Sequence, residues 1–249
     1  MKETIYTIPV MDAFREPCEC AFCHMRHVLE QNALDFMLGP STSYMEGDIR
    51  IKTDEIGFCR KHFGMMYALP NRLGVALMSQ THLARLRKDL SAIVQNKKPG
   101  ARVKKPLFGK AAPANVSPVS AYIKKLEGTC YICDMMENTF ARYIDTFFKL
   151  WPKEAELQAL VTDGKGFCLP HFAMMMDAAA EKLGGADYKV FAQLACEVQM
   201  RNLERVQADI DWFVQKFDYR FQNEPWRDSK DAPRRIIQKI SSEMIAEDA

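Results

Sequence analysis

One pattern of cysteine and histidine occurs twice in this sequence and constrains the fold more than any other feature. Each copy contains Cys-x-x-Cys and, further along, the string Thr-Asp-x-x-Gly-Phe-Cys-x-x-His-Phe. Between these two parts, the second cysteine and the third are 36 residues apart in one copy and 35 in the other. The eight candidate ligands are Cys20, Cys23, Cys59, His62, Cys130, Cys133, Cys168 and His171. The recurrence of all eight at matched spacing predicts an internal duplication.

The duplication extends beyond these ligands. Leu34-Asp35 returns as Ile144-Asp145, and the stretch from Leu83 to Gln95 returns from Leu203 to Gln215 with its Leu, Arg, Asp, Val and Gln at the same spacing. The sequence therefore predicts a first metal-binding repeat, a basic linker rich in proline and lysine, a second repeat, and a C-terminal loop and helix. Their boundaries are 1–96, 97–118, 119–221 and 222–249.

The spacing of apolar residues predicts helices throughout. One helix is expected from Cys23 to a stop at Gly39-Pro40, and its counterpart from Cys133 to Leu150. Further helices follow each ligand histidine, and two long amphipathic helices are expected to bury the face that begins at Leu83 and at Leu203. A last helix, about 233–245, is expected to pack through Ile236, Ile237 and Ile240. Strict alternation of apolar and polar residues, the pattern of a β-strand, is confined to 48–52. The predicted fold class is therefore all-α, with two pseudo-repeated helical halves.

The repeated motif has the chemistry of a structural zinc site. Zinc in such sites takes four ligands in a tetrahedron, mainly thiolate sulfur and imidazole nitrogen. We expect each Cys-x-x-Cys to join the Cys-x-x-His of its own copy, which makes two Cys3His sites and two zinc ions. Within the first copy this pairs Cys20 and Cys23 with Cys59 and His62, and the second copy follows in the same way.

Each ligand pair is expected at the start of a helix. Backbone N–H groups and the helix dipole favour negative charge there, which is expected to lower the thiol pKa values. Gly57 and Gly166 would allow a tight turn into the third ligand, and the neighbouring phenylalanines would exclude water. A metal that closes so long a loop converts its binding energy into folding energy.

Other uses of these cysteines stay open. Three cysteines and one histidine can also hold an iron–sulfur cluster, or act as thiols in a redox protein. Cysteine clusters that pack and bind nothing are a further alternative. Cys20-x-x-Cys23-His24 also spells a c-type haem motif, but the second copy has Asp134 in place of the histidine. Cys18 and Cys196 have no counterparts and are interpreted as spare thiols.

Composition bears on compartment and partners. Eight cysteines in a chain without a visible secretory signal or an apolar run of roughly 18 residues predict a cytoplasmic protein with reduced thiols and no membrane span. The net charge of +2 predicts no nucleic-acid partner. Eight basic and no acidic residues lie between Leu90 and Leu126, but the aromatic residues of a base-stacking surface are not interleaved there. This stretch is interpreted as a solvated linker, and nucleic-acid binding through it is a minor alternative.

The duplicated CxxC and GFCxxHF pattern resembles that of an uncharacterised family of bacterial proteins, over both halves of the chain. The resemblance points to the same eight ligands and implies no reaction. We find no nucleophile–base pair, phosphate loop or paired carboxylates, and four protein ligands per ion leave no open position for a substrate. The sequence therefore predicts a zinc-binding adaptor or regulator, with a protein partner possible, and favours a non-enzymatic role. An iron–sulfur or thiol-based redox protein is the alternative.

Overall fold

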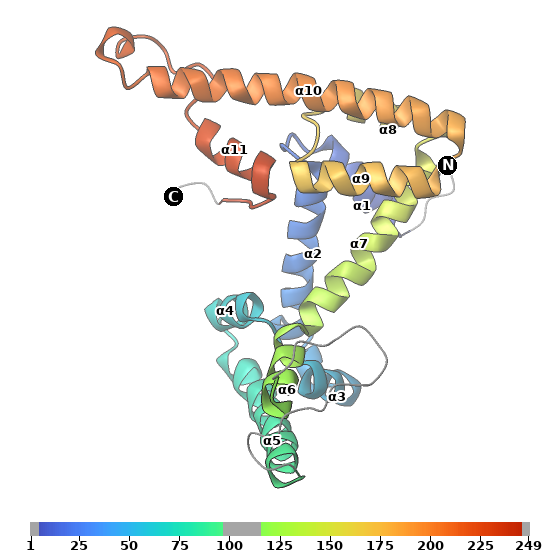
Figure 1. Ribbon diagram of the computed structural model, residues 1–249, viewed down its shortest axis with the longest axis vertical. Coiled ribbons are helices and arrows are strands. Elements are labelled where there is room, and N and C mark those ends of the chain that lie inside the picture. The colour runs from blue at the N-terminus through green and yellow to red at the C-terminus, as the bar shows by residue number, and fades with distance from the viewer. Residues whose placement is uncertain (1–4, 97–115, 246–249) are drawn as a thin grey trace. The chain divides into compact units, whose positions relative to one another are not determined.

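The computed structural model describes residues 5–96 and 116–245 (Figure 1). Within these ranges the chain forms eleven α-helices and two short 3-10 helices, and no strand. The prediction of an all-helical protein is confirmed. Most of the predicted linker, 97–115, lies outside the described residues. Its last three residues lead directly into α6 (Pro118–Glu127), where the Ser117 hydroxyl caps the helix by accepting from the Ser120 N–H.

The helices group into two compact units. The continuous unit is residues 30–138, and the discontinuous unit combines residues 1–29 with residues 139–249. The unit boundaries fall inside α2 (Ala21–Leu38) and α7 (Tyr131–Leu150). The domain boundaries predicted above follow the two sequence repeats, whereas each compact unit takes residues from both repeats. Repeats and units are therefore different divisions of this chain.

The discontinuous unit contains α1 (Thr7–Arg15), α8 (Ala155–Asp163), α9 (Leu169–Lys182), α10 (Gly185–Gln215), η2 (Tyr219–Phe221) and α11 (Ala232–Ser241), with the first part of α2 and the last part of α7. The long helix α10 packs against α8, α9 and α11, and α1 packs against α8 (Figure 1). The core of the unit is aromatic. Fully buried Phe22, Phe147, Trp151, Phe167 and Phe191 make ring contacts with one another.

The continuous unit contains η1 (Ser43–Met45), α3 (Gly47–Ile56), α4 (Arg60–Ala68), α5 (Arg72–Asn96) and α6, with the last part of α2 and the first part of α7. Helix α5 contacts α3, α4, α6 and η1. The alternating segment 48–52 is helical, because it lies within α3 and buries Ile49 and Thr53, which are four residues apart on one helical face.

Several predicted helix boundaries are confirmed. Helix α2 ends at Leu38, and the next residue, Gly39, donates its N–H to the Asp35 carbonyl. Helix α7 ends at Leu150, directly before Trp151-Pro152. Both expected post-histidine helices are present as α4 and α9, and both long helices as α5 and α10. The long helices bury less than predicted, since Leu83, Val94 and Val214 are each more than half exposed, and Phe217, also expected on the second of them, is exposed and lies beyond the end of α10.

The predicted packing of the last helix through its isoleucines is wrong for two of the three, because only Ile236 is half-buried. Ile237 and Ile240 on α11 are 41% and 62% exposed, and the buried side chains of this helix are Ala232, Arg235 and Lys239. Arg235 bonds to Asp209 on α10 at 2.6 Å and to Asp231 at 2.9 Å. Helix α11 therefore packs through its charged face, because carboxylates and carbonyls in the rest of the unit provide partners for the charges.

Candidate metal centres

The eight predicted ligands come together in two groups, but the predicted pairing within each copy is wrong. Cys20 and Cys23 meet Cys168 and His171, and Cys130 and Cys133 meet Cys59 and His62. Each Cys-x-x-Cys therefore joins the Cys-x-x-His of the other copy. We call the two groups the Cys20 site and the Cys59 site. Each lies within one compact unit, the Cys20 site in the discontinuous unit and the Cys59 site in the continuous one.

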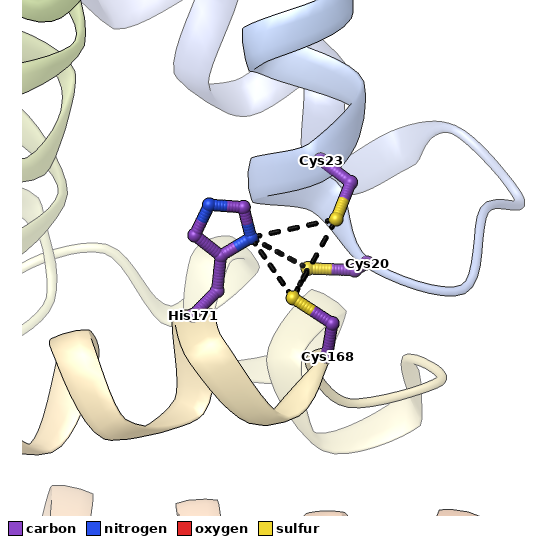
Figure 2. Close-up of side chains that lie close together, drawn as sticks. All are labelled: Cys20, Cys23, Cys168 and His171. Atoms are coloured by element: carbon purple, nitrogen blue, oxygen red, sulfur yellow. Dashed lines mark hydrogen bonds between the residues drawn. The ribbon is translucent and has the colours of Figure 1, made fainter. Parts of the chain in front are cut away.

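In the Cys20 site, three sulfur atoms surround one imidazole nitrogen. Figure 2 shows the sulfurs of Cys20, Cys23 and Cys168 facing the Nδ1 atom of His171. The Nδ1 atom lies 3.5, 3.4 and 3.1 Å from these three sulfurs, in that order. The Cys168 sulfur lies 3.8 Å from that of Cys20 and 3.5 Å from that of Cys23. All four side chains are buried.

The Cys59 site has the same composition and similar dimensions. The Nδ1 atom of His62 lies 3.3 Å from the Cys59 sulfur, 3.1 Å from that of Cys130 and 3.4 Å from that of Cys133. The sulfurs of Cys59 and Cys133 are 4.0 Å apart. This site is less enclosed, because Cys59 and Cys133 are only half-buried.

These distances match a single tetrahedral ion. A zinc ion with bonds of about 2.3 Å to sulfur and about 2.0 Å to nitrogen holds its sulfurs about 3.8 Å apart and its sulfur and nitrogen about 3.5 Å apart. In both sites all four ligand atoms lie within 4.8 Å of one another. The sulfurs are too far apart to be bonded to each other, and every cysteine is free. Two buried Cys3His groups in this protein can therefore each hold a metal ion.

All four ligand pairs lie at helix starts, as predicted. Cys20, Cys59, Cys130 and Cys168 each directly precede a helix, and their partners stand three residues later in the first turn. The first-turn backbone N–H groups have no partner within the helix and point toward these side chains. The Cys133 N–H, for example, donates to the Cys130 sulfur at 3.5 Å.

Positive backbone φ angles precede the third ligand in both copies. Gly57 has a φ of 68° and Gly166 a φ of 72°. Residues other than glycine rarely adopt this region. The conformation lets the chain turn from the end of α3 into Cys59, and from the loop after α8 into Cys168. This confirms the predicted role of the two glycines.

Without a metal ion, the thiols of each site do not ionise alike. Hydrogen bonds from Cys20 and Cys23 lower the pKa of Cys168 far below its usual value. Burial, together with the bond to Cys168, raises the pKa of Cys20 to about 12. In the other site, burial and the neighbouring Cys130 raise the pKa of Cys133 to about 12.

The Cys59 thiol also has a shifted pKa. Burial opposes its ionisation, but hydrogen bonds from the His62 backbone and from neighbouring thiols outweigh burial and lower its pKa. The sequence-based expectation of lowered thiol pKa values thus holds for Cys59 and Cys168. It fails for Cys20, Cys23 and Cys133, because they are desolvated and share a site with another negative sulfur.

The two ligand histidines are held by different neighbours. The Nε2 atom of His62 lies 3.0 Å from the buried carboxylate of Glu30, which also forms an ion pair with Lys61 at 2.6 Å. A carboxylate in this position commonly orients a metal-binding histidine, and here it leaves Nδ1 free to act as the ligand. His171 instead lies between the rings of Phe22 and Phe140, with centroids 5.9 and 5.7 Å away. Glu30 and Phe140 each stand seven residues after the second cysteine of their own copy.

The end of α11 covers the Cys20 site. The Ser242 hydroxyl lies 3.1 Å from the Cys168 sulfur. One turn earlier, the ammonium of Lys239 is buried, donating to the Glu19 carbonyl at 2.6 Å and to the Lys165 carbonyl, and pairing with the Glu19 carboxylate at 3.2 Å. Burial lowers the pKa of Lys239, while the charges of Glu19 and Cys20 act to raise it. A zinc ion with three thiolates would carry one net negative charge, which would act on the pKa of Lys239 in the same direction as the charge of Cys20.

Sequence reasoning missed the residues that support the ligands: Glu30, Glu19, Lys239 and Ser242. Glu30 had no signal, since its position seven residues after Cys23 points to the site of Cys23, whereas its carboxylate lies against His62 of the other site. Lys239 and Ser242 had none, because only the tertiary fold brings α11 to a cysteine some 70 residues away or more. Cys18 is half-buried and Cys196 exposed, and neither belongs to a ligand group in the part of the chain that the structure describes.

Comparison with known proteins places the chain in a family. The model of DUF6062, a family of unknown function, matches residues 1–247. The chain belongs to this family. No curated protein and no solved structure matches it. Among the described residues, no helix has both the length and the apolar character needed to cross a membrane.

Proposed function

We propose that this DUF6062 protein binds two zinc ions, one in the Cys20 site and one in the Cys59 site, and that the ions hold its helices together. The observation that carries the proposal is the gathering of eight ligands from four helix starts into two tetrads of tetrahedral dimensions. Clusters that merely packed would not need Nδ1 of both histidines to face three sulfurs at 3.1 to 3.5 Å.

The dimensions of each site favour one ion over an iron–sulfur cluster. In a cluster with four protein ligands the ligands bind to at least two iron atoms, which spreads them beyond the reach of a single metal ion. The sulfur separations of 3.5, 3.8 and 4.0 Å fit ligands of one ion instead. Zinc is the ion that most commonly takes three cysteines and one histidine in a structural site.

A structural role follows from the coordination and from the chain connections. Four protein ligands fill a tetrahedral zinc ion and leave no position for a substrate or water, so we assign the sites no catalysis. Each ion would link two helix starts, at Cys20 and Cys168 or at Cys59 and Cys130. The apparent binding free energy of structural zinc, about 10 to 16 kcal/mol, would then stabilise both units.

We further propose that the zinc-bound fold serves as an adaptor or regulator in the cytoplasm. Eight free cysteines suit a reducing compartment. Exposed apolar side chains on α11 and beyond the end of α10, among them Ile240, Phe217 and Tyr219, support a protein partner. A role in redox chemistry through iron–sulfur clusters is the competing proposal.

Metal content per chain tests this proposal directly. Elemental mass spectrometry on protein purified anaerobically, without an affinity metal, should find two zinc ions per chain. A brown protein that contains iron and an equimolar amount of sulfide would show that the sites hold iron–sulfur clusters and not zinc. Protein that is folded and free of any metal would overturn the proposal.

A further inference from the structure

The two sites differ in how far their sulfurs are open to solvent. The Cys20 site is buried at all four ligands, whereas Cys59 and Cys133 are half-buried. Reactivity of cysteines follows thiolate character and access. A metal-bound thiolate carries negative charge in both sites, so access is the property that separates them.

A cavity of about 390 Å³ explains the access to Cys59. It lies in the continuous unit and is lined by Cys59 together with Ile56, Phe58, His82, Leu86 and Leu126. The imidazole of His82 is held in place, because its Nδ1 atom lies 2.8 Å from the Asp54 carbonyl and its ring contacts the backbone at Gly57. A small solute that enters this cavity reaches the Cys59 side chain.

In the other copy, a glutamine lies against the residues that lead into the third ligand. The match of Leu83 with Leu203 places Ser79 opposite Gln199 and His82 opposite Asn202. Gln199 is buried and bonds to both the N–H and the carbonyl of Phe167, the residue before Cys168, each at 3.0 Å. At the Cys59 site, the side chain that lies against the corresponding glycine, Gly57, is His82, which also lines the cavity. The two copies therefore place different side chains beside the residues that lead into the third ligand.

We propose that Cys59 is a reactive metal-bound thiolate, and that a peroxide oxidises it together with Cys133 to a disulfide, which releases the metal ion of the Cys59 site alone. This inference rests on the proposed function, since it assumes that zinc occupies both sites. It assigns different roles to the two sites: the Cys20 site is structural, and the Cys59 site responds to oxidants.

The oxidation proceeds in two balanced steps. The Cys59 thiolate attacks one oxygen of the peroxide, an S–O bond forms, the O–O bond breaks, and the leaving hydroxide takes a proton to become water. The Cys133 thiolate then attacks the Cys59 sulfur, the S–S bond forms, the S–O bond breaks, and a second hydroxide leaves as water after protonation. Two sulfurs are oxidised by two electrons in total, and the peroxide is reduced to two waters.

The geometry suits the second step. The Cys59 and Cys133 sulfurs are 4.0 Å apart, so they must approach by about 2 Å to form a disulfide. Once oxidised to the sulfenic form, the Cys59 sulfur is no longer a thiolate ligand and can leave the ion to approach Cys133. His62 and Cys130 alone are then too few ligands to retain zinc in a four-coordinate site.

The test uses the full chain loaded with two zinc ions and treated with hydrogen peroxide in the presence of a chromogenic chelator. One zinc ion per chain should be released at least about tenfold faster than the other. Peptide mapping should find a Cys59–Cys133 disulfide, with Cys20, Cys23 and Cys168 still reduced. Equal release from both sites, faster loss from the Cys20 site, or no release would overturn the inference.

A substitution that fills the cavity sharpens this test. Leu86→Trp, at a half-buried residue that lines the cavity, should slow the fast release several-fold while the chain keeps two zinc ions, because the larger side chain fills the approach to Cys59. Leu83→Trp, at an exposed position of the same helix, is the matched control and should release zinc at the original rate. Equal release rates in the two variants would overturn access through the cavity.

The same experiment separates the two proposals. Metal content is measured before peroxide is added. A chain without metal at that point overturns both the proposed function and this inference. A chain with two zinc ions that loses both or neither overturns this inference and leaves the proposed function standing.

Discussion

At the scale of single residues, the two histidine ligands have the same role but different support. His62 has a buried carboxylate as its outer partner, and His171 has two aromatic rings. Burial lowers the pKa of His62, which favours the neutral ring that a metal requires, and Lys61 together with His62 holds the pKa of Glu30 below its usual value against the effect of burial.

Glu30→Gln should weaken zinc binding at the Cys59 site about 10- to 100-fold and leave the Cys20 site unchanged, because an amide orients the imidazole less strongly than a carboxylate. Competition with a chelator of known affinity measures both sites. Glu55→Gln, an exposed position on α3 in the same unit, is the control. Equal weakening at the two sites would contradict the assignment of Glu30 to His62.

Zinc affinity should also depend on pH. With pKa values of about 12, Cys20 and Cys133 are protonated at neutral pH in the metal-free protein, so zinc must displace their protons. Affinity therefore rises with pH and falls as pH is lowered, by about tenfold per unit for each proton released. Apparent dissociation constants measured between pH 6 and 8 check this, and a constant that did not change with pH would show that all ligands were already deprotonated.

At the scale of elements, α11 shows how tertiary partners override a helical pattern. Its isoleucines suggest a buried face, yet the helix buries Arg235 and Lys239 against Asp209 and Glu19. A charge inside a protein is tolerated where partners of opposite charge and carbonyl oxygens surround it. Since Ser242 at the end of this helix touches the Cys20 site, the orientation of α11 also completes that site.

Replacing both Ile237 and Ile240 with glutamate should therefore change the free energy of unfolding by less than about 1 kcal/mol, because both side chains are exposed. Lys239→Met should cost more, about 1 to 3 kcal/mol, because it removes one of the cations from the buried Glu19 carboxylate, which keeps Arg205 at 2.6 Å. Chemical denaturation of the zinc-loaded variants measures both values. A larger loss of stability in the isoleucine variant than in Lys239→Met would show that α11 packs through its isoleucines.

At the scale of the whole molecule, the crossed pairing of ligands determines how the chain is organised. The Cys59 site joins positions 59 and 130, and the Cys20 site joins positions 20 and 168, so one loop lies inside the other. The inner site belongs to a unit that is continuous in sequence, whereas the outer site needs both ends of the chain. The inner unit can therefore form first, because it closes the shorter loop.

Double variants test the crossed pairing by metal count. Cys20→Ala with Cys168→Ala should lose one zinc ion per chain, because both residues belong to one site. Cys20→Ala with Cys59→Ala should lose both ions, because each site loses a ligand. Elemental analysis of the two proteins gives the counts, and pairing within each copy would give the opposite result.

The sequence by itself determined the helical fold, the eight ligands and their positions at helix starts. These features depend on local spacing: apolar periodicity, two residues between ligands, and glycine where φ is positive. The repeats alone do not say which Cys-x-x-Cys meets which Cys-x-x-His, because equivalent motifs have equivalent chemistry and either pairing satisfies a tetrahedral ion. Only the tertiary structure decided that the copies exchange ligands, that α11 buries its charges, and that one site is more open to solvent than the other. Each of these depends on which surfaces the whole chain can bury together, and local spacing does not contain that information.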